Sequence, residues 1–281
     1  MPPEAQEIRD QQRQTWDKFS AGWGKWDQVV MQMLAPVGEE MIRELQVAAD
    51  AHHLDVASGT GEPGLTIAAA APHGRVVLTD LAGDMLAIAR QNAARRGLSN
   101  VEVRECSADA LPFADATFDS VSCRFGLMFV PDIAACVKEL ARVLKPGGRL
   151  SAAVWAEPEG NPWATIPMSA IAAEVDMPPP SPDTPSLFRC AKRGAIARIF
   201  EGAGLRDVAE TEVRSVLRTA SPEEYWQYQT EVAAPVVAGL SRVDAAGRDR
   251  IKAVVVENVL RFAVGREVHV PTHARCIVGT K

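Results

Sequence analysis

The sequence contains few cysteines, and none of them has the spacing of a metal or redox motif. The five cysteines are odd in number, scattered, and never arranged as C-x-x-C. A disulfide framework needs paired cysteines, and a structural zinc site needs closely spaced ligands. We therefore predict reduced, mostly buried thiols. No His/Cys/Asp grouping has the spacing of a metal site, so we expect no bound metal.

Basic clusters are also missing. The chain has 30 Lys and Arg against 36 Asp and Glu, a formal net charge of -6 and a pI near 5.5. No run of Lys and Arg exceeds two or three residues, so the sequence has no stretch suited to following a phosphate backbone. Nucleic acid is not an expected partner.

The chain has no apolar run near the length of about 20 residues that a membrane span needs. Its first residues, MPPEAQEIRDQQRQ, are polar and acidic, unlike a secretory signal. We expect no membrane span and a cytoplasmic location. The sequence leaves both a monomer and a homodimer open.

Hydrophobic residues make up 47% of the chain and charged residues 23%, enough for a full core in a soluble protein. The 281 residues predict one domain with additions. Residues 1–50 have helical periodicity. From residue 51, short apolar runs alternate with helical stretches, which predicts an α/β fold with parallel strands and helices on both faces.

One predicted helix begins near residue 132, because its apolar positions form a single stripe, and Lys145-Pro146-Gly147-Gly148 ends it. Residues 177–185, MPPPSPDTP, predict a proline-rich loop. Two late strands, near RDVAETEVRSVL (206–217) and at THARCIVGT (272–280), enclose about fifty helical residues. They predict a terminal strand pair with a helical lid over the edge of the sheet.

The stretch DVASGTGEPG, residues 55–64, contains G-x-G-x-x-G, a pattern typical of dinucleotide sites. Asp80 ends the next strand, 21 residues beyond Gly59, where a carboxylate can accept hydrogen bonds from a ribose. A pyrophosphate, however, needs free N–H groups at the start of a helix. Pro63 lacks one, and Glu62 and Asp55 add negative charge, so the loop favours a ligand that is cationic nearby, such as S-adenosylmethionine.

Five segments follow in the order and spacing of a known family: DVASGTG, VVLTDLAGDML, SADALPFADATFDSV, CRFGLMFVPD and ARVLKPGGRL. They resemble the motifs of class I S-adenosylmethionine-dependent methyltransferases, most closely the ubiquinone/menaquinone C-methyltransferase-like group. The resemblance covers roughly residues 51–156. It implies a doubly wound, Rossmann-like sheet of seven strands with an antiparallel last strand. The core (51–156) would follow a helical N-terminal lid (1–50) and precede the end of the sheet with a helical cap insertion (157–281).

The resemblance also implies a set of cofactor contacts. Around the methionine and ribose they are Asp55, Ala57, Gly59, Gly61 and Asp80. Around the adenine they are Leu81, Met85, Asp109 and Ala110. Arg124 and Phe125 would border the sulfonium and the substrate. From the lid, we expect Phe19 and Trp23 to close over the cofactor.

Methyl transfer from a sulfonium needs alignment more than a protein base, and no clear base is identifiable. Arg124 and His269 are the candidates for a catalytic role. The fourth strand ends in CRFG, without the Asn/Asp-Pro-Pro-aromatic motif of amino-methylating enzymes. We therefore expect C- or O-methylation of a small aromatic, phenolic or quinone-like acceptor. A nucleotide-dependent oxidoreductase and a non-catalytic S-adenosylmethionine-binding protein remain the alternatives.

Overall fold

The computed structural model describes residues 3–176 and 184–281. The chain begins with two long helices, α1 (Pro3–Lys25) and α2 (Asp27–Leu45), in agreement with the helical periodicity of residues 1–50. Most of the proline-rich loop predicted for residues 177–185 lies outside the described residues.

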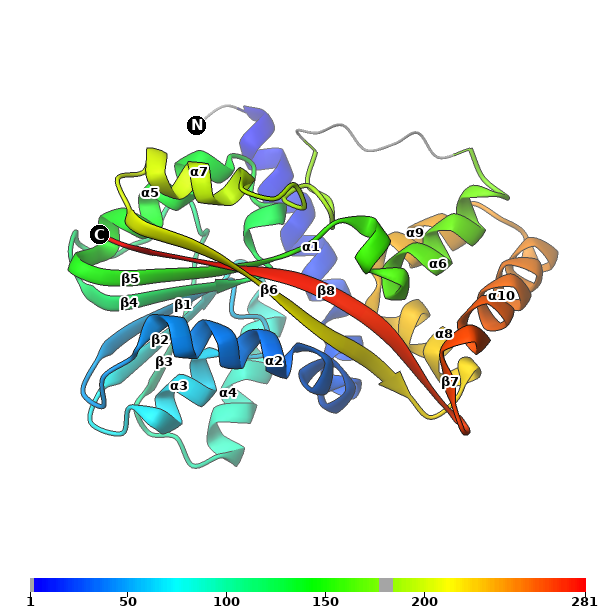
Figure 1. Ribbon diagram of the computed structural model, residues 1–281, viewed down its shortest axis with the longest axis horizontal. Helices are drawn as coiled ribbons and strands as arrows, with labels where there is room; N and C mark the ends of the chain where they lie inside the picture. The colour runs from blue at the N-terminus through cyan, green and yellow to red at the C-terminus, as the bar shows by residue number, and fades with distance from the viewer. Residues whose placement is uncertain (1–2, 177–183) are drawn as a thin grey trace.

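A mixed sheet forms the centre of the molecule (Figure 1). Its order is β3-β2-β1-β4-β5-β8-β6, and a short β7 pairs with β8 beyond this path. β1 to β5 pair in parallel, whereas β8 is antiparallel to both of its neighbours. The strands are β1 (His52–Val56), β2 (Arg75–Asp80), β3 (Val101–Glu105), β4 (Phe118–Arg124), β5 (Leu144–Trp155), β6 (Arg206–Thr219), β7 (Ala263–Val264) and β8 (Glu267–Thr280).

This topology confirms the predicted doubly wound fold with an antiparallel last strand. The order reverses between β1 and β4, because the chain crosses from β3 back to the centre of the sheet. In open α/β sheets, ligands bind outside the carboxyl ends of the strands at such a reversal. The fold therefore places a candidate site where the chain leaves β1 and β4.

Helices cover both faces of the sheet (Figure 1): α5 and α7 lie on one face, and α2, α3 and α4 on the other. The helices after α2 are α3 (Gly64–Ala70), α4 (Gly83–Arg95), α5 (Ile133–Val143), α6 (Pro162–Ala172), α7 (Ala195–Gly202), α8 (Pro222–Val232), α9 (Ala234–Leu240) and α10 (Ala245–Val259). Three short 3-10 turns complete the elements: η1 (Leu127–Phe129), η2 (Pro158–Gly160) and η3 (Leu260–Phe262).

Local capping fixes several helix starts. The side chains of Asp132, Ser221 and Asp244 each accept a hydrogen bond from a backbone N–H in the first turn of α5, α8 and α10. α5 ends at Val143, two residues before the predicted stop, and residues 145–148 form the start of β5 instead of a turn between helix and strand.

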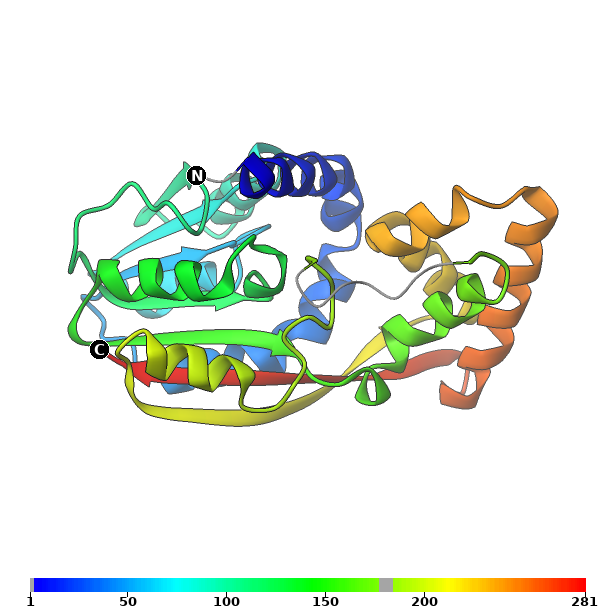
Figure 2. The same cartoon turned by 90° about the horizontal axis from the view of Figure 1, so that it is seen from above.

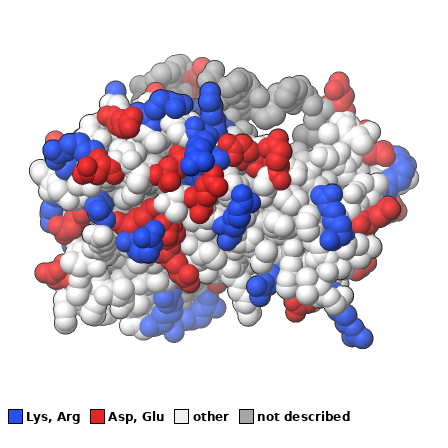
Figure 3. All heavy atoms as spheres, viewed as in Figure 1, with Lys and Arg blue, Asp and Glu red and all other residues white. Residues whose placement is uncertain are grey.

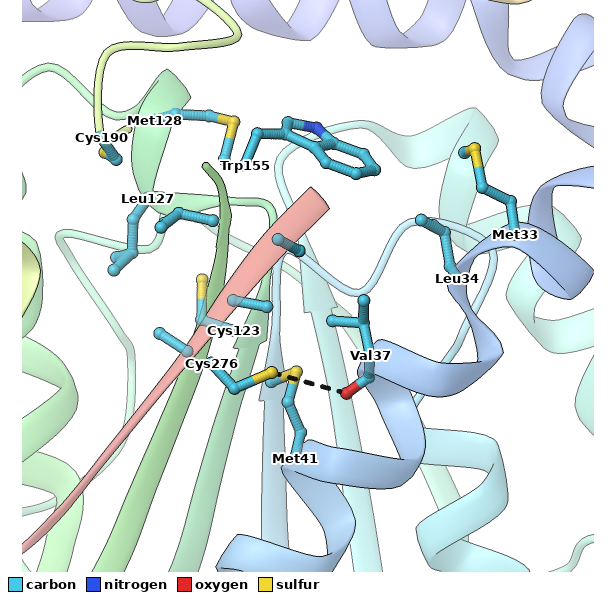
Figure 4. Close-up of a cluster of buried hydrophobic side chains, with 14 of the residues drawn as sticks. Met33, Leu34, Val37, Met41, Cys123, Leu127, Met128, Trp155, Cys190 and Cys276 are labelled. Atoms are coloured by element: carbon cyan, nitrogen blue, oxygen red, sulfur yellow. Dashed lines mark hydrogen bonds between the residues drawn. The ribbon is translucent and has the colours of Figure 1, made fainter. Parts of the chain in front are cut away.

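The main hydrophobic core covers both faces of the sheet and continues into the cap, and α2 packs on the middle of the sheet. Figure 4 shows Val37 and Met41 of α2 beside Cys123 of β4 and Cys276 of β8, whose thiol donates to the Val37 carbonyl oxygen at 3.8 Å. All five cysteines are free and four are buried, as predicted from their spacing. α2 is thereby fixed across the centre of the sheet, with its first turn at the carboxyl ends of the strands.

The last two long strands extend the sheet beyond β5. β6 and β8 have 14 residues each, and β8 begins five residues earlier than the sequence indicated. α6 and α8–α10 gather on this extension and form a cap at one end of the molecule (Figure 2). The predicted terminal strand pair with intervening helices is therefore present.

A buried asparagine joins the cap to the sheet. The Asn161 amide group donates to the carbonyl oxygens of Ala156, Glu157 and His273, while its oxygen accepts from His273 N and Trp163 Nε1. Both the donors and the oxygen of this amide have partners, so the hydrogen bonds fix the start of α6 against β8.

Acidic and basic side chains are interspersed over the face drawn in Figure 3, and the described part of that face has no continuous basic area. Among the described helices, none combines the length and apolar character needed to cross a membrane.

Candidate cofactor site

The glycine loop connects β1 to α3 at the carboxyl edge of the sheet. Ala57 and Gly59 both have a left-handed backbone, with φ of 53° each, and no atom lies within 4 Å of the position that a Gly59 Cβ would take. At Gly64, by contrast, a Cβ would lie 2.3 Å from the Leu78 side chain. The third glycine therefore permits close packing of α3 on the sheet, while Gly59 leaves open space.

Asp55 lies at the end of β1 and is fully buried. Its Oδ2 accepts from Gly64 N at 3.0 Å and its Oδ1 accepts from Ser122 Oγ at 2.6 Å. Burial raises the pKa of this carboxyl to about 7, against the opposing effect of the Ser122 hydrogen bond. Asp55 therefore holds the glycine loop against β4.

A buried histidine extends this network into the sheet. The ring nitrogens of His53 lie 2.8 Å from Ser120 Oγ and 2.9 Å from Ser122 Oγ. Burial lowers the pKa of His53 to about 3, so the ring is neutral. Since the Ser122 hydroxyl donates to Asp55, it accepts from His53 Nε2–H, and His53 Nδ1 accepts from Ser120.

Asp80 ends β2 and connects the glycine loop to the next helix. Its Oδ2 accepts from Gly59 N and its Oδ1 from Ala82 N, both at 2.9 Å. Burial raises the pKa of this carboxyl, and the backbone hydrogen bonds oppose the rise. Each oxygen keeps a free acceptor position. The carboxylate lies directly beside the open space over Gly59.

The first amides of α3 are occupied by acceptors from the chain itself. Gly64 N donates to Asp55 and Leu65 N to the Gly61 carbonyl oxygen, at 3.0 and 2.8 Å. Thr66 N donates to Glu62 Oε2 at 3.1 Å. These are the groups that a pyrophosphate would need at a helix N-terminus.

Glu62 places its carboxylate at the start of α3, where the sequence led us to expect negative charge. It accepts from the Thr66 amide and also forms an ion pair with Arg96 of α4, which the sequence did not predict. Its first effect is therefore to occupy a helix amide, and much of its charge is balanced by Arg96.

Asp109, the expected adenine contact, forms an ion pair that the sequence did not predict. Arg9 of α1 donates to it through Nε at 3.0 Å and Nη2 at 2.5 Å, and Ser107 Oγ donates at 2.5 Å. Burial acts to raise the pKa of Asp109, but these hydrogen bonds and the Arg9 charge hold it below its usual value. No short motif marks Arg9, because the pairing joins residues 100 positions apart.

α1 makes two more contacts with the expected adenosine region. Arg13 Nε donates to the Leu81 carbonyl oxygen at 3.4 Å, and Asp17 accepts from Asp84 N at 3.1 Å. Met85 is buried in the first turn of α4, whereas Ala110 is exposed. The lid helix thus lies on the turns after β2 and β3.

Aromatic side chains gather at the ends of β4 and β5. Phe125 has a left-handed backbone, with φ of 59°, and stacks on Trp155 at a ring separation of 4.1 Å. Trp155 also contacts Trp163 of α6, 4.8 Å away. A left-handed backbone is costly for a phenylalanine and is found most often at functional sites.

The lid contributes a second aromatic group. Trp16 packs edge-to-face on Trp23 and on Phe129 of η1, at 5.9 and 5.2 Å. Trp23 Nε1 is buried without a hydrogen-bond partner among the described residues. Phe19 is half-buried under the Lys18 ammonium. Through Phe129, Trp16 contacts the turn that follows β4. The sequence did not indicate Trp16 as a site residue.

Arg124 points from the tip of β4 toward α2. Its guanidinium donates to the Leu34 carbonyl oxygen at 3.4 Å and to Met31 Sδ at 3.5 Å, and it forms no salt bridge within the described ranges. Burial lowers its pKa, and the nearby carboxylates, with Asp55 foremost, oppose this. The side chain thus faces the helix that packs beside the glycine loop.

His269 lies away from this group. It is five residues along β8 from Ala274, which pairs with the end of β5, a separation of about 17 Å along the strand. Its Nε2 pairs with Glu267 Oε2 at 2.6 Å. The structure therefore does not bring His269 to the glycine loop. In residues 3–176 and 184–281, no cluster of three His, Cys, Asp or Glu side chains is arranged to hold a metal ion.

The chain is similar to several known proteins. An uncharacterized protein of Mycobacterium tuberculosis is 34% identical over 163 residues, covering 57% of this chain and 58% of that protein. A demethylmenaquinone methyltransferase of Thermus thermophilus is 48% identical over 97 residues, covering 34% of this chain and 44% of that enzyme. The matched part of the chain thus spans less than two thirds of either relative.

The YcgJ protein of Bacillus subtilis has the same fold, with a TM-score of 0.55 at 20% identity, over 87% of this chain and 97% of that one. The sequence model of the ubiE/COQ5 methyltransferase family matches residues 24–165, which include the glycine loop, Asp80, Asp109 and the aromatic end of β5. With half of its length matched, the chain belongs to the ubiE/COQ5 methyltransferase family.

Proposed function

We propose that the protein transfers a methyl group from S-adenosylmethionine to a small aromatic, phenolic or quinone-like acceptor, at carbon or oxygen. Family membership supports the reaction class. The demethylmenaquinone methyltransferase among its relatives supports the acceptor class. The proposal reaches beyond the matched half of the chain, because the cap and lid would enclose the acceptor.

The occupied amides of α3 are the observation that carries the choice of cofactor. A dinucleotide would have to displace Asp55 or Glu62 from these N–H groups and place phosphates beside carboxylates. An adenosyl sulfonium has no phosphate and gains from nearby negative charge. This favours S-adenosylmethionine over the dinucleotide of an oxidoreductase.

The residues around the loop fit the cofactor. Asp80 keeps one free acceptor position on each oxygen, which suits the two hydroxyls of a ribose. The Ser58 hydroxyl is buried without a partner in the described residues, so it is free to bond a polar group of a ligand. The open space over Gly59 leaves room for the ligand to pass close to the backbone.

When bound, S-adenosylmethionine supplies an electrophilic methyl group, and the chain has to align an acceptor with it and keep water out. The stacked rings of Phe125, Trp155 and Trp163 offer a flat apolar surface for such an acceptor. Arg124 faces α2, and His269 lies far along β8. We assign neither residue as a catalytic base.

A transfer assay tests this proposal. Tritiated S-adenosylmethionine is incubated with hydroquinones, phenols and catechols, using wild type, Asp80→Ala and, as a control, Asp115→Ala, which removes an exposed carboxylate. We expect label in at least one acceptor, and a loss of about 10- to 100-fold in kcat/KM for Asp80→Ala only, the effect of losing charged hydrogen bonds.

Tight binding of S-adenosylhomocysteine without transfer to any acceptor would instead favour a non-catalytic binding protein. Equal activity of wild type and Asp80→Ala would contradict the role of Asp80.

A further inference from the structure

The ion pair between α1 and the β3 turn is buried, which is unusual for a contact between a lid and a core. The side chains of Arg9 and Asp109 are only 7% and 5% exposed. The guanidinium meets the carboxylate through two nitrogens, a geometry that fixes the orientation of both groups. Gln6 Oε1 accepts from Arg9 Nη1 at 3.4 Å and supports the arginine from its own helix.

The acceptor capacity of Asp109 is nearly used. An ionised carboxylate has about four lone-pair positions, two on each oxygen. Oδ1 accepts from Arg9 Nε and from Ser107 Oγ, so both of its positions are filled. Within residues 3–176 and 184–281, Oδ2 accepts only from Arg9 Nη2. One acceptor position therefore remains, and it lies on Oδ2.

The contact is part of a row along α1. Arg9, Arg13 and Asp17 are spaced by four residues and share one face of the helix. They contact, in order, Asp109, the Leu81 carbonyl oxygen and Asp84 N. α1 thus crosses the turns that would surround an adenine, with Arg9 at the position nearest to the candidate adenine acceptor.

We propose that Arg9 is a positioning residue for adenine recognition: it holds Asp109 so that the single free position on Oδ2 accepts the exocyclic amino group. This rests on the proposed function. The arginine keeps the carboxylate ionised and stops it from rotating. Adenine, whose amino group is a donor, is then favoured over hypoxanthine, which presents an oxygen at the same place.

Binding of two ligands by calorimetry tests the role of Arg9. S-adenosylhomocysteine carries adenine, and S-inosylhomocysteine is the same molecule with hypoxanthine. The variants are Arg9→Gln, Arg9→Lys and, as a matched control, Arg75→Gln, which removes an arginine paired with Glu102 at the opposite end of β2. Circular dichroism and melting confirm that each variant is folded.

Wild type and Arg75→Gln should prefer the adenine ligand by at least about tenfold. Arg9→Gln should lose about tenfold in affinity for S-adenosylhomocysteine and change little for S-inosylhomocysteine, so the preference collapses. Arg9→Lys should recover part of it, because an ammonium keeps the charge and one hydrogen bond.

Two outcomes would overturn the proposal. Equal losses for both ligands would mean that Arg9 only docks α1, and tighter binding of S-adenosylhomocysteine by Arg9→Gln would mean that Arg9 competes with the ligand for Asp109. Failure of wild type to bind either ligand would instead refute the proposed function.

Discussion

Among single residues, Asp55 gives the clearest dependence of stability on pH. Its pKa is about 7 in the folded protein and near the ordinary 3.8 when unfolded. Between these values the folded carboxyl keeps a proton that the unfolded chain has lost. Its contribution is therefore fully present below pH 3.8 and is lost as pH rises through about 7.

Asp55→Asn should remove this part of the pH dependence, since an amide can still accept from Gly64 N and does not titrate. We expect the free energy of unfolding, measured in urea between about pH 4 and pH 7.5, to fall less steeply with pH than in wild type. Asp115→Asn, at an exposed carboxylate, should keep the wild-type slope. The same slope in Asp55→Asn and wild type would contradict the buried, proton-binding state of Asp55.

The sequence indicated Asp55 and Asp80 through the strand pattern and Asp109 through the family resemblance, and all three lie at or just beyond the ends of parallel strands that share one edge. It did not predict Arg9, whose partner is 100 residues away and depends on how α1 crosses the sheet. Nor did it predict the ion pair of Glu62 with Arg96, since that partner lies on another helix, 34 residues along the chain.

At the scale of elements, α1 is held at both ends. Its first half contacts the β2 and β3 turns, and its last turns contact α8. There, Glu231 of α8 accepts from Lys25 Nζ and from Trp26 Nε1 at 2.7 Å. α1 thus connects the turns after β2 and β3 to the helical cap.

Gly22 permits this contact, because a Cβ at that position would lie 2.0 Å from the Glu231 carbonyl oxygen. Gly22→Ala should push α1 from α8, lower the free energy of unfolding by about 1 to 3 kcal/mol and weaken S-adenosylhomocysteine binding. Gly202→Ala in α7, where no atom lies within 4 Å, is the control and should be neutral or slightly stabilising. Urea unfolding and calorimetry measure both effects. If Gly22→Ala changed neither the free energy of unfolding nor the binding of S-adenosylhomocysteine, α1 would not need this close packing.

Most strands and helices could be predicted, because period and stop signals agree in segments such as α5. α6 was not predicted, and α9, although it lies in the helical stretch expected between the two late strands, was not recognised as a separate helix. α6 contains Pro167 in its interior and is apolar all round, so it has no amphipathic stripe. α9 is only seven residues long and begins two residues after α8 ends. Both are helical because they pack within the cap.

At the scale of the whole molecule, the strand order of the sheet determines where the candidate site lies. It places the ends of β1, β2 and β4 side by side, so residues 55, 80 and 125 lie at one edge of the sheet although the sequence separates them. The alternation of strands and helices predicted the parallel sheet, and the family resemblance predicted which residues lie at this edge. Most of β6 was predicted (206–217), but the first five residues of β8, which help to carry the cap beyond β5, were not. Val268 and Val270 are buried there, yet a proline such as Pro271 argues against a strand.

The central claim is that this edge binds an adenosyl sulfonium and not a dinucleotide. The most direct measurement is thermal melting of wild type and Asp80→Ala with S-adenosylhomocysteine or NAD. A ligand that binds only the folded state raises the melting temperature by mass action. We predict a rise with S-adenosylhomocysteine in wild type that Asp80→Ala loses, and none with NAD. Stabilisation by NAD alone would contradict the account and favour an oxidoreductase.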